Sequence, residues 1–241
     1  LNSGNPQTPA RLFDGRGTRQ AAGGSRMNER ELIYDWNIID YEIQRDSSNH
    51  PHDVWFDDET LRDGLQSPSA RNPSIEQKIE LIDYMERLGI QKVDLGLPGA
   101  GPFHVSHIDA MLTHMGENSY DLRPGCAVRT VVGDIEPLVD LQAKHERQIQ
   151  ASAFLGTSPI RQFAEGWTME RILSTAEKAV TFAVDNDIPV MFVTEDTTRS
   201  KPEEIKAVYT RAIELGADRI CVCDTCGHVT PNGVRKLLTF I

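Results

Sequence analysis

Short apolar runs alternate with amphipathic stretches along the chain from about residue 53 onward. The runs are apolar on both faces, which is typical of parallel strands covered by helices. They fall at 54–56, 92–95, 126–129, 149–154, 190–193 and 219–223. Between them, apolar residues recur at helical spacing, as at Ile75, Ile79, Ile82 and Met85. A strand followed by a helix, repeated six times, predicts an α/β protein with a parallel sheet.

The ends of two predicted helices carry specific signals. Ser74, followed three residues later by Gln77, predicts a capping box, and Gly89 suits the position just after the end of that helix. Pro202 suits the first turn of another helix, which Gly216 ends. These signals place the polar segments discussed below in the loops between strands and helices.

Two architectures fit such a sheet: a doubly wound open sheet and a closed barrel. Gly96, Gly99 and Gly101 follow the order G-x-x-G-x-G, which is not the dinucleotide-binding fingerprint of the doubly wound fold. Polar or turn-forming residues lie just past the ends of five different strands: Asp63, Pro98, Thr157, Glu195 and Thr225. In a (β/α)8 barrel these ends meet on one face, where active sites are found. We therefore expect a (β/α)8 TIM barrel.

The barrel is expected to be incomplete within this chain. Residues 53–241 supply six β/α units, whereas eight units typically take roughly 250 residues. Residues 1–52 are interpreted as an N-terminal tail and lead-in segment, with a flexible first part. Residues 1–26 are rich in arginine and poor in acids, so an organelle-import segment is the alternative to a tail.

Charge and cysteine content narrow the classes of partner. A net charge of −11 and a pI near 5.1 argue against a nucleic-acid-binding face. No apolar run approaches the roughly 18 residues of a membrane helix. Cys221, Cys223 and Cys226 are interpreted as reduced, buried thiols of a cytoplasmic protein. A zinc site including His228 is the weaker alternative, because no second Cys-x-x-Cys pair exists.

The segment 57–68 carries the strongest candidate chemistry. Arg62 and Asp63 adjoin at a predicted strand end and precede Gly64, which permits a tight turn. A carboxylate there can bind a hard divalent cation, and a guanidinium can hold an oxyanion or a carboxylate. The alternative interpretation is a surface ion pair beside a turn.

Glu195 sits at the expected end of the fifth strand, where it could act as a general acid or base. The alternative is that the segment only leads into the next helix, with Asp196 and Ser200 as caps. Three histidines follow the second strand, at positions 104, 107 and 114. We expect the first to lie near the loop after that strand and the other two to be solvated.

These segments resemble the DRE-TIM metallolyase superfamily, which includes 2-isopropylmalate synthases, homocitrate synthases and hydroxymethylglutaryl-CoA lyases. Residues 58–68 resemble its D-x-T-L-R-D-G-x-Q-x-P signature. Further matches follow in order at 93–98, 154–160, 195–200 and 224–231. The resemblance covers residues 53–241 and is closest to the 2-isopropylmalate synthase-like condensing enzymes.

The resemblance implies an acyltransferase reaction, as in leucine biosynthesis. A 2-keto acid chelates a divalent cation (Mg²⁺, Mn²⁺ or Zn²⁺), and the deprotonated methyl group of acetyl-CoA or another acyl-CoA attacks the polarised carbonyl. Hydrolysis of the thioester follows, and a homodimer is expected. By position, Asp63 would be a metal ligand, Arg62 would stabilise the oxyanion and Glu195 would belong to the acid–base machinery. Substrate contacts are expected from Gln66, Asp94, Arg129 and Thr225.

Several positions depart from the superfamily pattern. Asp94 replaces a glutamate, Arg161 replaces a histidine, and the H-x-H metal pair of the seventh strand would fall beyond Ile241. With Asp63 alone, metal binding should be weak. Leu65 occupies a position that is glutamate in most synthases, a form shared with the lyases. Two alternatives therefore stay open: a 3-hydroxyacyl-CoA lyase, and a catalytically inert partial barrel that binds a partner.

Overall fold

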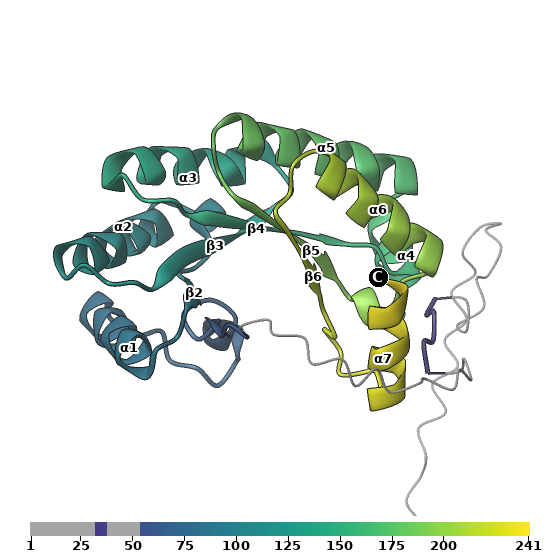
Figure 1. Ribbon diagram of the computed structural model, residues 1–241, viewed down its shortest axis with the longest axis horizontal. Coiled ribbons are helices and arrows are strands. Elements are labelled where there is room, and N and C mark those ends of the chain that lie inside the picture. Colours follow the sequence, from purple (N-terminus) through teal and green to yellow (C-terminus); the bar gives the residue numbers. More distant parts are fainter. Residues whose placement is uncertain (1–31, 38–53) are drawn as a thin grey trace, which may run out of the picture.

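Six parallel strands form one curled sheet in the computed structural model, which describes residues 32–37 and 54–241 (Figure 1). The strands are β1 (Asp57–Asp58), β2 (Lys92–Asp94), β3 (Arg123–Arg129), β4 (Gln150–Gly156), β5 (Val190–Glu195) and β6 (Arg219–Val222). They pair in the order β1-β2-β3-β4-β5-β6, each with the next along the chain. A doubly wound sheet reverses its order, so that alternative is wrong. The fold is a partial TIM barrel, as predicted.

Helices cover the outer side of the curled sheet (Figure 1). They are α1 (Ile75–Leu88), α2 (Pro102–Glu117), α3 (Val132–His145), α4 (Pro159–Glu165), α5 (Met169–Asp185), α6 (Pro202–Glu214) and α7 (Pro231–Phe240). Single 3-10 turns follow three strands: η2 (Gly64–Gln66), η3 (Pro98–Ala100) and η4 (Thr197–Arg199). Among residues 32–37 and 54–241, no helix has the length and apolar character needed to cross a bilayer.

The predicted helix ends of α1 and α6 are confirmed. Ser74 Oγ accepts from the Gln77 amide, and Gln77 Oε1 accepts from the Ser74 amide, which completes the capping box. Gly89 ends α1 with a left-handed φ of 73°. Gly216, two residues after α6, has a φ of 103°. Both glycines adopt backbone conformations that other residues rarely tolerate.

The first strand begins later than its apolar run predicts. The pairing with β2 covers Asp57 and Asp58, whereas Val54 and Phe56 are 79% and 65% exposed. The reason is that β1 is an edge strand and has a neighbour on one side only. Trp55 lies under the guanidinium groups of Arg123 and Arg219, with carbon-to-centroid distances of 4.3 and 5.0 Å.

A short piece of the N-terminal region packs against the far end of the chain. Trp36 is 3% exposed, and its Nε1 donates to the Ser200 carbonyl at 3.1 Å. Its ring lies 5.4 Å from that of Phe240 in α7. Residues 32–37 are therefore a docked segment. The expected flexible part of the tail and the import alternative lie outside the described residues.

Candidate functional site

A cavity of about 570 Å³ opens at the carboxyl ends of the strands, and we call it the strand-end cavity. The loop after β1, the end of β5 and the loop after β6 all contribute side chains to its wall. Five residues predicted for the site line it: Arg62, Asp63, Gln66, Glu195 and Thr225. Asp63 and Glu195, which are distant in sequence, thus share one cavity because parallel barrel strands end on the same face.

Arg62 lies at the centre of three carboxylates. It contacts Glu59 most closely, and its Nη1 and Nε atoms lie 3.1 Å from Asp63 and 3.5 Å from Asp94. Burial alone would lower the pKa of Arg62, but the three negative charges outweigh it and raise that pKa. The guanidinium is therefore charged and held in one orientation. Sequence reasoning missed Glu59, although its position three residues before Arg62 was a signal.

Asp94 supports Arg62 from below the cavity wall. It is 2% exposed, and its Oδ1 accepts from the Gly96 and Ala127 amides at 2.9 and 3.3 Å. Burial, followed by the charge of Glu59, raises the pKa of Asp94 to about 7. Asp94 does not line the strand-end cavity and contacts Arg62 from behind, so a positioning role is what its geometry supports, and the expected substrate contact stays a prediction.

Arg129 stands apart from the other predicted residues. Its Nε and Nη2 atoms donate to the two oxygens of Asp134, each at 2.7 Å, and its side chain is 58% exposed. It does not line the strand-end cavity. The buried Asp134 carboxylate already accepts hydrogen bonds from two nitrogens of the Arg129 guanidinium. This geometry therefore does not support a substrate contact from Arg129.

Gly99 makes room for that ion pair. A Cβ added at Gly99 would lie 2.3 Å from Asp134 Cγ, and Asp134 is 3% exposed. We expect Gly99→Ala to lower the free energy of unfolding by about 1 to 2 kcal/mol, because Asp134 must shift inside a packed region. Urea unfolding measures this change. Gly133→Ala is the matched control, since its Cβ would meet nothing within 4 Å, and an equal loss in both variants would contradict the packing argument.

Glu195 and Thr225 present polar groups on the opposite wall. Glu195 Oε2 lies 3.5 Å from Arg161 Nη2, and the Glu195 side chain is 32% exposed. Thr225 Oγ1 accepts from the Asp196 amide at 2.9 Å. The Thr225 hydroxyl proton finds no acceptor among the described residues, so it can be donated into the cavity. A carboxylate for proton transfer and a hydrogen-bond donor therefore face the same space as Arg62.

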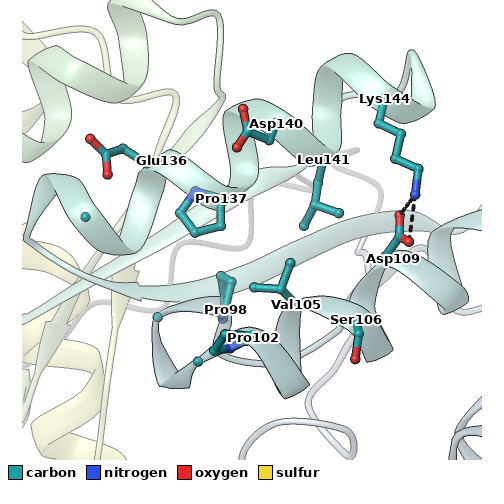
Figure 2. Close-up of a pocket in the computed structure, with 13 residues that line it drawn as sticks. Pro98, Pro102, Val105, Ser106, Asp109, Glu136, Pro137, Asp140, Leu141 and Lys144 are labelled. Atoms are coloured by element: carbon teal, nitrogen blue, oxygen red, sulfur yellow. Dashed lines mark hydrogen bonds and ion pairs between the residues drawn. The ribbon is translucent and has the colours of Figure 1, made fainter.

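A larger cavity, of about 710 Å³, lies elsewhere. It is a groove on the outer surface between α2 and α3, and the ion pair of Lys144 with Asp109 at 2.7 Å borders it (Figure 2). None of the predicted site residues lines it. The groove follows from the packing of two neighbouring outer helices and offers no group of reactive side chains.

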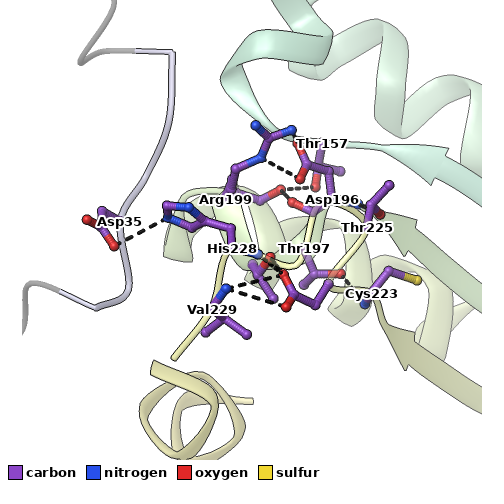
Figure 3. A network of polar contacts seen from close by, with 12 residues as sticks. Asp35, Thr157, Asp196, Thr197, Arg199, Cys223, Thr225, His228 and Val229 are labelled. Atoms are coloured by element: carbon purple, nitrogen blue, oxygen red, sulfur yellow. Dashed lines mark hydrogen bonds and ion pairs between the residues drawn. The ribbon is translucent and has the colours of Figure 1, made fainter. Parts of the chain in front are cut away.

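The residues after Glu195 lock two loops together (Figure 3). Asp196, in the left-handed region with a φ of 63°, accepts two bonds of 2.7 Å from Arg199. Asp224 accepts from Thr198 Oγ1 at 2.7 Å, which joins the loops after β5 and β6. The expected alternative, in which Asp196 and Ser200 cap α6, is wrong, because Lys201 is the N-cap residue and makes no side-chain cap.

The cysteines are free thiols in different surroundings. Cys221 and Cys223 line the strand-end cavity with their Sγ atoms 3.8 Å apart, as expected for two residues on one strand face. The predicted burial of Cys221, Cys223 and Cys226 is wrong, because the first two are partly exposed and Cys226 is exposed; Cys126, for which no prediction was made, is buried. Within residues 32–37 and 54–241, no three His, Cys, Asp or Glu side chains are grouped to hold a metal ion, which argues against structural zinc.

The strand-end cavity suits a hard cation in the type of its donors. The Asp63 side chain is 66% exposed, and carboxylate, amide and hydroxyl oxygens of Glu195, Gln66 and Thr225 share its cavity. Oxygen ligands are those that Mg²⁺ prefers, and this ion keeps several waters. The described residues supply fewer protein ligands than a closed site needs. Weak metal binding through Asp63 stays a prediction.

Comparison with known proteins gives consistent matches. A 2-isopropylmalate synthase of Sediminispirochaeta smaragdinae is 29% identical over 192 residues, which are 79% of this chain and 37% of that protein. The homocitrate synthase AksA of Methanopyrus kandleri is 32% identical over 193 residues, which are 79% of this chain and 46% of that protein. The chain thus spans less than half the length of these relatives.

The comparison of structures concerns the fold alone. The crystal structure of the HMG-CoA lyase from Brucella melitensis matches with a TM-score of 0.61 at 15% identity, over 78% of this chain and 66% of that one. A family model described as HMGL-like matches residues 53–241, which is most of the chain. The chain therefore belongs to the HMGL-like family.

Proposed function

We propose that the protein is a metal-dependent acyltransferase that condenses acetyl-CoA, or another acyl-CoA, with a 2-keto acid, as a 2-isopropylmalate synthase does. The observation that carries this proposal is the meeting of Arg62, Asp63, Glu195 and Thr225 in the strand-end cavity. The names of the relatives support the same class of reaction. The free thiols agree with a cytoplasmic location, and the homodimer stays a prediction.

Each side chain has a distinct task in this proposal. A divalent cation held by Asp63 would supply Lewis-acid polarisation of the keto group. The Arg62 guanidinium stabilises negative charge that develops on the keto oxygen, and its carboxylate partners keep it aimed. Thr225 donates its hydroxyl proton to the carboxylate of the keto acid. Glu195 takes or gives a proton at the wall opposite Arg62, and the Gln66 amide contacts the substrate.

The lyase alternative has one observation in its favour, the leucine at position 65. Leu65 lies beside Arg62 in the wall of a smaller neighbouring cavity. The likeness to the Brucella melitensis enzyme concerns the fold only and does not decide the direction of the reaction. Cleavage of a 3-hydroxyacyl-CoA, measured under the same conditions as condensation, separates the two.

The direct test is release of free CoA thiol from acetyl-CoA by the full-length protein with a series of 2-keto acids. We expect release that depends on the keto acid, needs Mg²⁺, Mn²⁺ or Zn²⁺, and stops when a chelator removes the metal. Denatured protein and reactions without keto acid are the controls. Failure of every keto acid, with the protein shown to be folded, would reject the proposal and favour the inert partial barrel.

A further inference from the structure

A second cavity adjoins the strand-end cavity. It has a volume of about 270 Å³ and lies between the loop after β1, the first turn of α1 and the N-terminal half of α2. The two cavities share Arg62, Gln66 and Leu97 in their walls. We call the second one the cationic pocket, because besides Arg62 its ionisable lining residues are Lys78, His104 and His107.

No carboxylate lines the cationic pocket among the described residues. This matters because the chain as a whole carries a net charge of −11. Glu76, which interacts electrostatically with His107, is exposed and lies outside the lining. Asn72 and Gln66 add amide donors. The lining of the pocket therefore offers positive charge and hydrogen-bond donors and contains no carboxylate, although Arg62 is already paired with three carboxylates outside it.

Lys78 gives the first indication that the pocket binds an anion. It is 5% exposed, and in the described part of the chain its Nζ atom takes part in no hydrogen bond or ion pair. Burial lowers the pKa of Lys78. Lysine side chains are seldom this deeply buried, and in proteins the charge of such a side chain is normally paired. A bound anion would supply the missing partner.

His107 gives a second, independent indication. Its Nδ1 atom is buried and lacks a hydrogen-bond partner, whereas the sequence analysis expected this side chain to be solvated. Burial and the neighbouring charges of Lys78 and His104 lower the pKa of His107. Buried ring nitrogens normally find a partner. A largely buried lysine of α1 and an unsatisfied ring nitrogen of α2 thus meet at one cavity.

We propose that the cationic pocket binds the second acid group of a dianionic 2-keto acid, one with a carboxylate or phosphonate at the end away from its keto group. The identity of this ligand rests on the proposed function. The shared wall formed by Arg62 and Gln66 brings the pocket close to where the keto group would react. The phosphates of an acyl-CoA are a poorer fit, because the long pantetheine arm separates them from the thioester.

The anion site can be tested without any turnover. Calorimetry with inorganic phosphate, in the absence of metal, compares the wild type with Lys78→Met, which keeps the length of the side chain and removes its charge. We expect at least tenfold weaker phosphate binding in the variant, because a charge-assisted contact is lost. Thermal unfolding should show that Lys78→Met is folded, since removing an unpaired buried charge relieves a desolvation cost.

The matched control is Lys206→Met, which removes an exposed lysine of α6 and should bind phosphate as the wild type does. Equal phosphate binding by the wild type and Lys78→Met would overturn the anion site.

Turnover then tests the identity of the ligand. With the full-length protein, we expect higher kcat/KM for 2-ketoglutarate than for 2-ketoisovalerate, whose tail is apolar. Lys78→Met should raise the KM for 2-ketoglutarate at least tenfold, with little change in kcat and none in the KM for 2-ketoisovalerate.

Two results would separate this inference from the proposed function. A wild-type preference for 2-ketoisovalerate would overturn the inference and leave the condensation reaction in place. Phosphate binding that depends on Lys78, without condensation of any keto acid, would overturn the proposed ligand together with the function.

Discussion

Replacement of Arg62 by lysine is expected to lower kcat for condensation by about 10²- to 10³-fold, with a much smaller change in KM. The guanidinium would act mainly on charge that develops during the reaction, and loss of one such donor typically has an effect of this size. An ammonium group cannot contact Glu59, Asp63 and Asp94 at once, so lysine would be both shorter in reach and poorly oriented.

The assay of thiol release measures this effect, and unfolding in urea checks that the variant is folded. Arg71→Lys is the matched control, because Arg71 is exposed and lies outside the strand-end cavity. If Arg62→Lys keeps the turnover of the wild type, Arg62 has no role in stabilising the oxyanion.

The stability of the wild type is expected to fall between pH 5 and pH 8 by about 2 to 3 kcal/mol more than that of Asp94→Asn. Burial raises the pKa of Asp94 to about 7, well above the usual value for an aspartate, so the folded chain holds a proton that the unfolded chain releases. This contribution is fully present below the unfolded pKa. It is lost as the pH rises through the folded pKa near 7, whereas asparagine does not titrate.

Urea unfolding of both proteins at pH 5 and pH 8 gives the comparison. Glu136→Gln, which changes an exposed carboxylate of α3, controls for the loss of one acidic group and should follow the wild type. Parallel pH dependences in the wild type and Asp94→Asn would show that Asp94 is ionised throughout this range.

The fold could be predicted largely because parallel barrel strands have a distinctive pattern. β3 and β4 are buried along most of their length and are mainly apolar, and the end signals of α1 and α6 mark two of the helices. The prediction failed at β1, where the apolar run lies before the start of an edge strand and stays exposed. Hydrophobic pattern alone does not say which strand has only one neighbour.

The candidate site was predictable to the extent that it depends on topology. Arg62, Asp63, Glu195 and Thr225 share a cavity because strand ends converge, which the order of elements implies. Arg129 also lies at the end of a strand, yet its side chain bonds to Asp134 and does not line the cavity. Such pairings depend on side-chain packing.

The amphipathic pattern of α1 did not indicate that Lys78 is buried. It is a polar position between apolar ones, which normally indicates solvent, but the neighbouring helix and loop bury it.

The docking of residues 32–37 has a consequence for the order of events during synthesis. Each β/α unit packs on the next, so the early units can assemble as they leave the ribosome. Trp36, however, bonds to Ser200, 164 positions later, and stacks near Phe240 at the end of α7. Closing so long a loop is entropically costly until the intervening units are in place. Residues 32–37 therefore dock late, after the β/α units between Trp36 and Ser200 have formed.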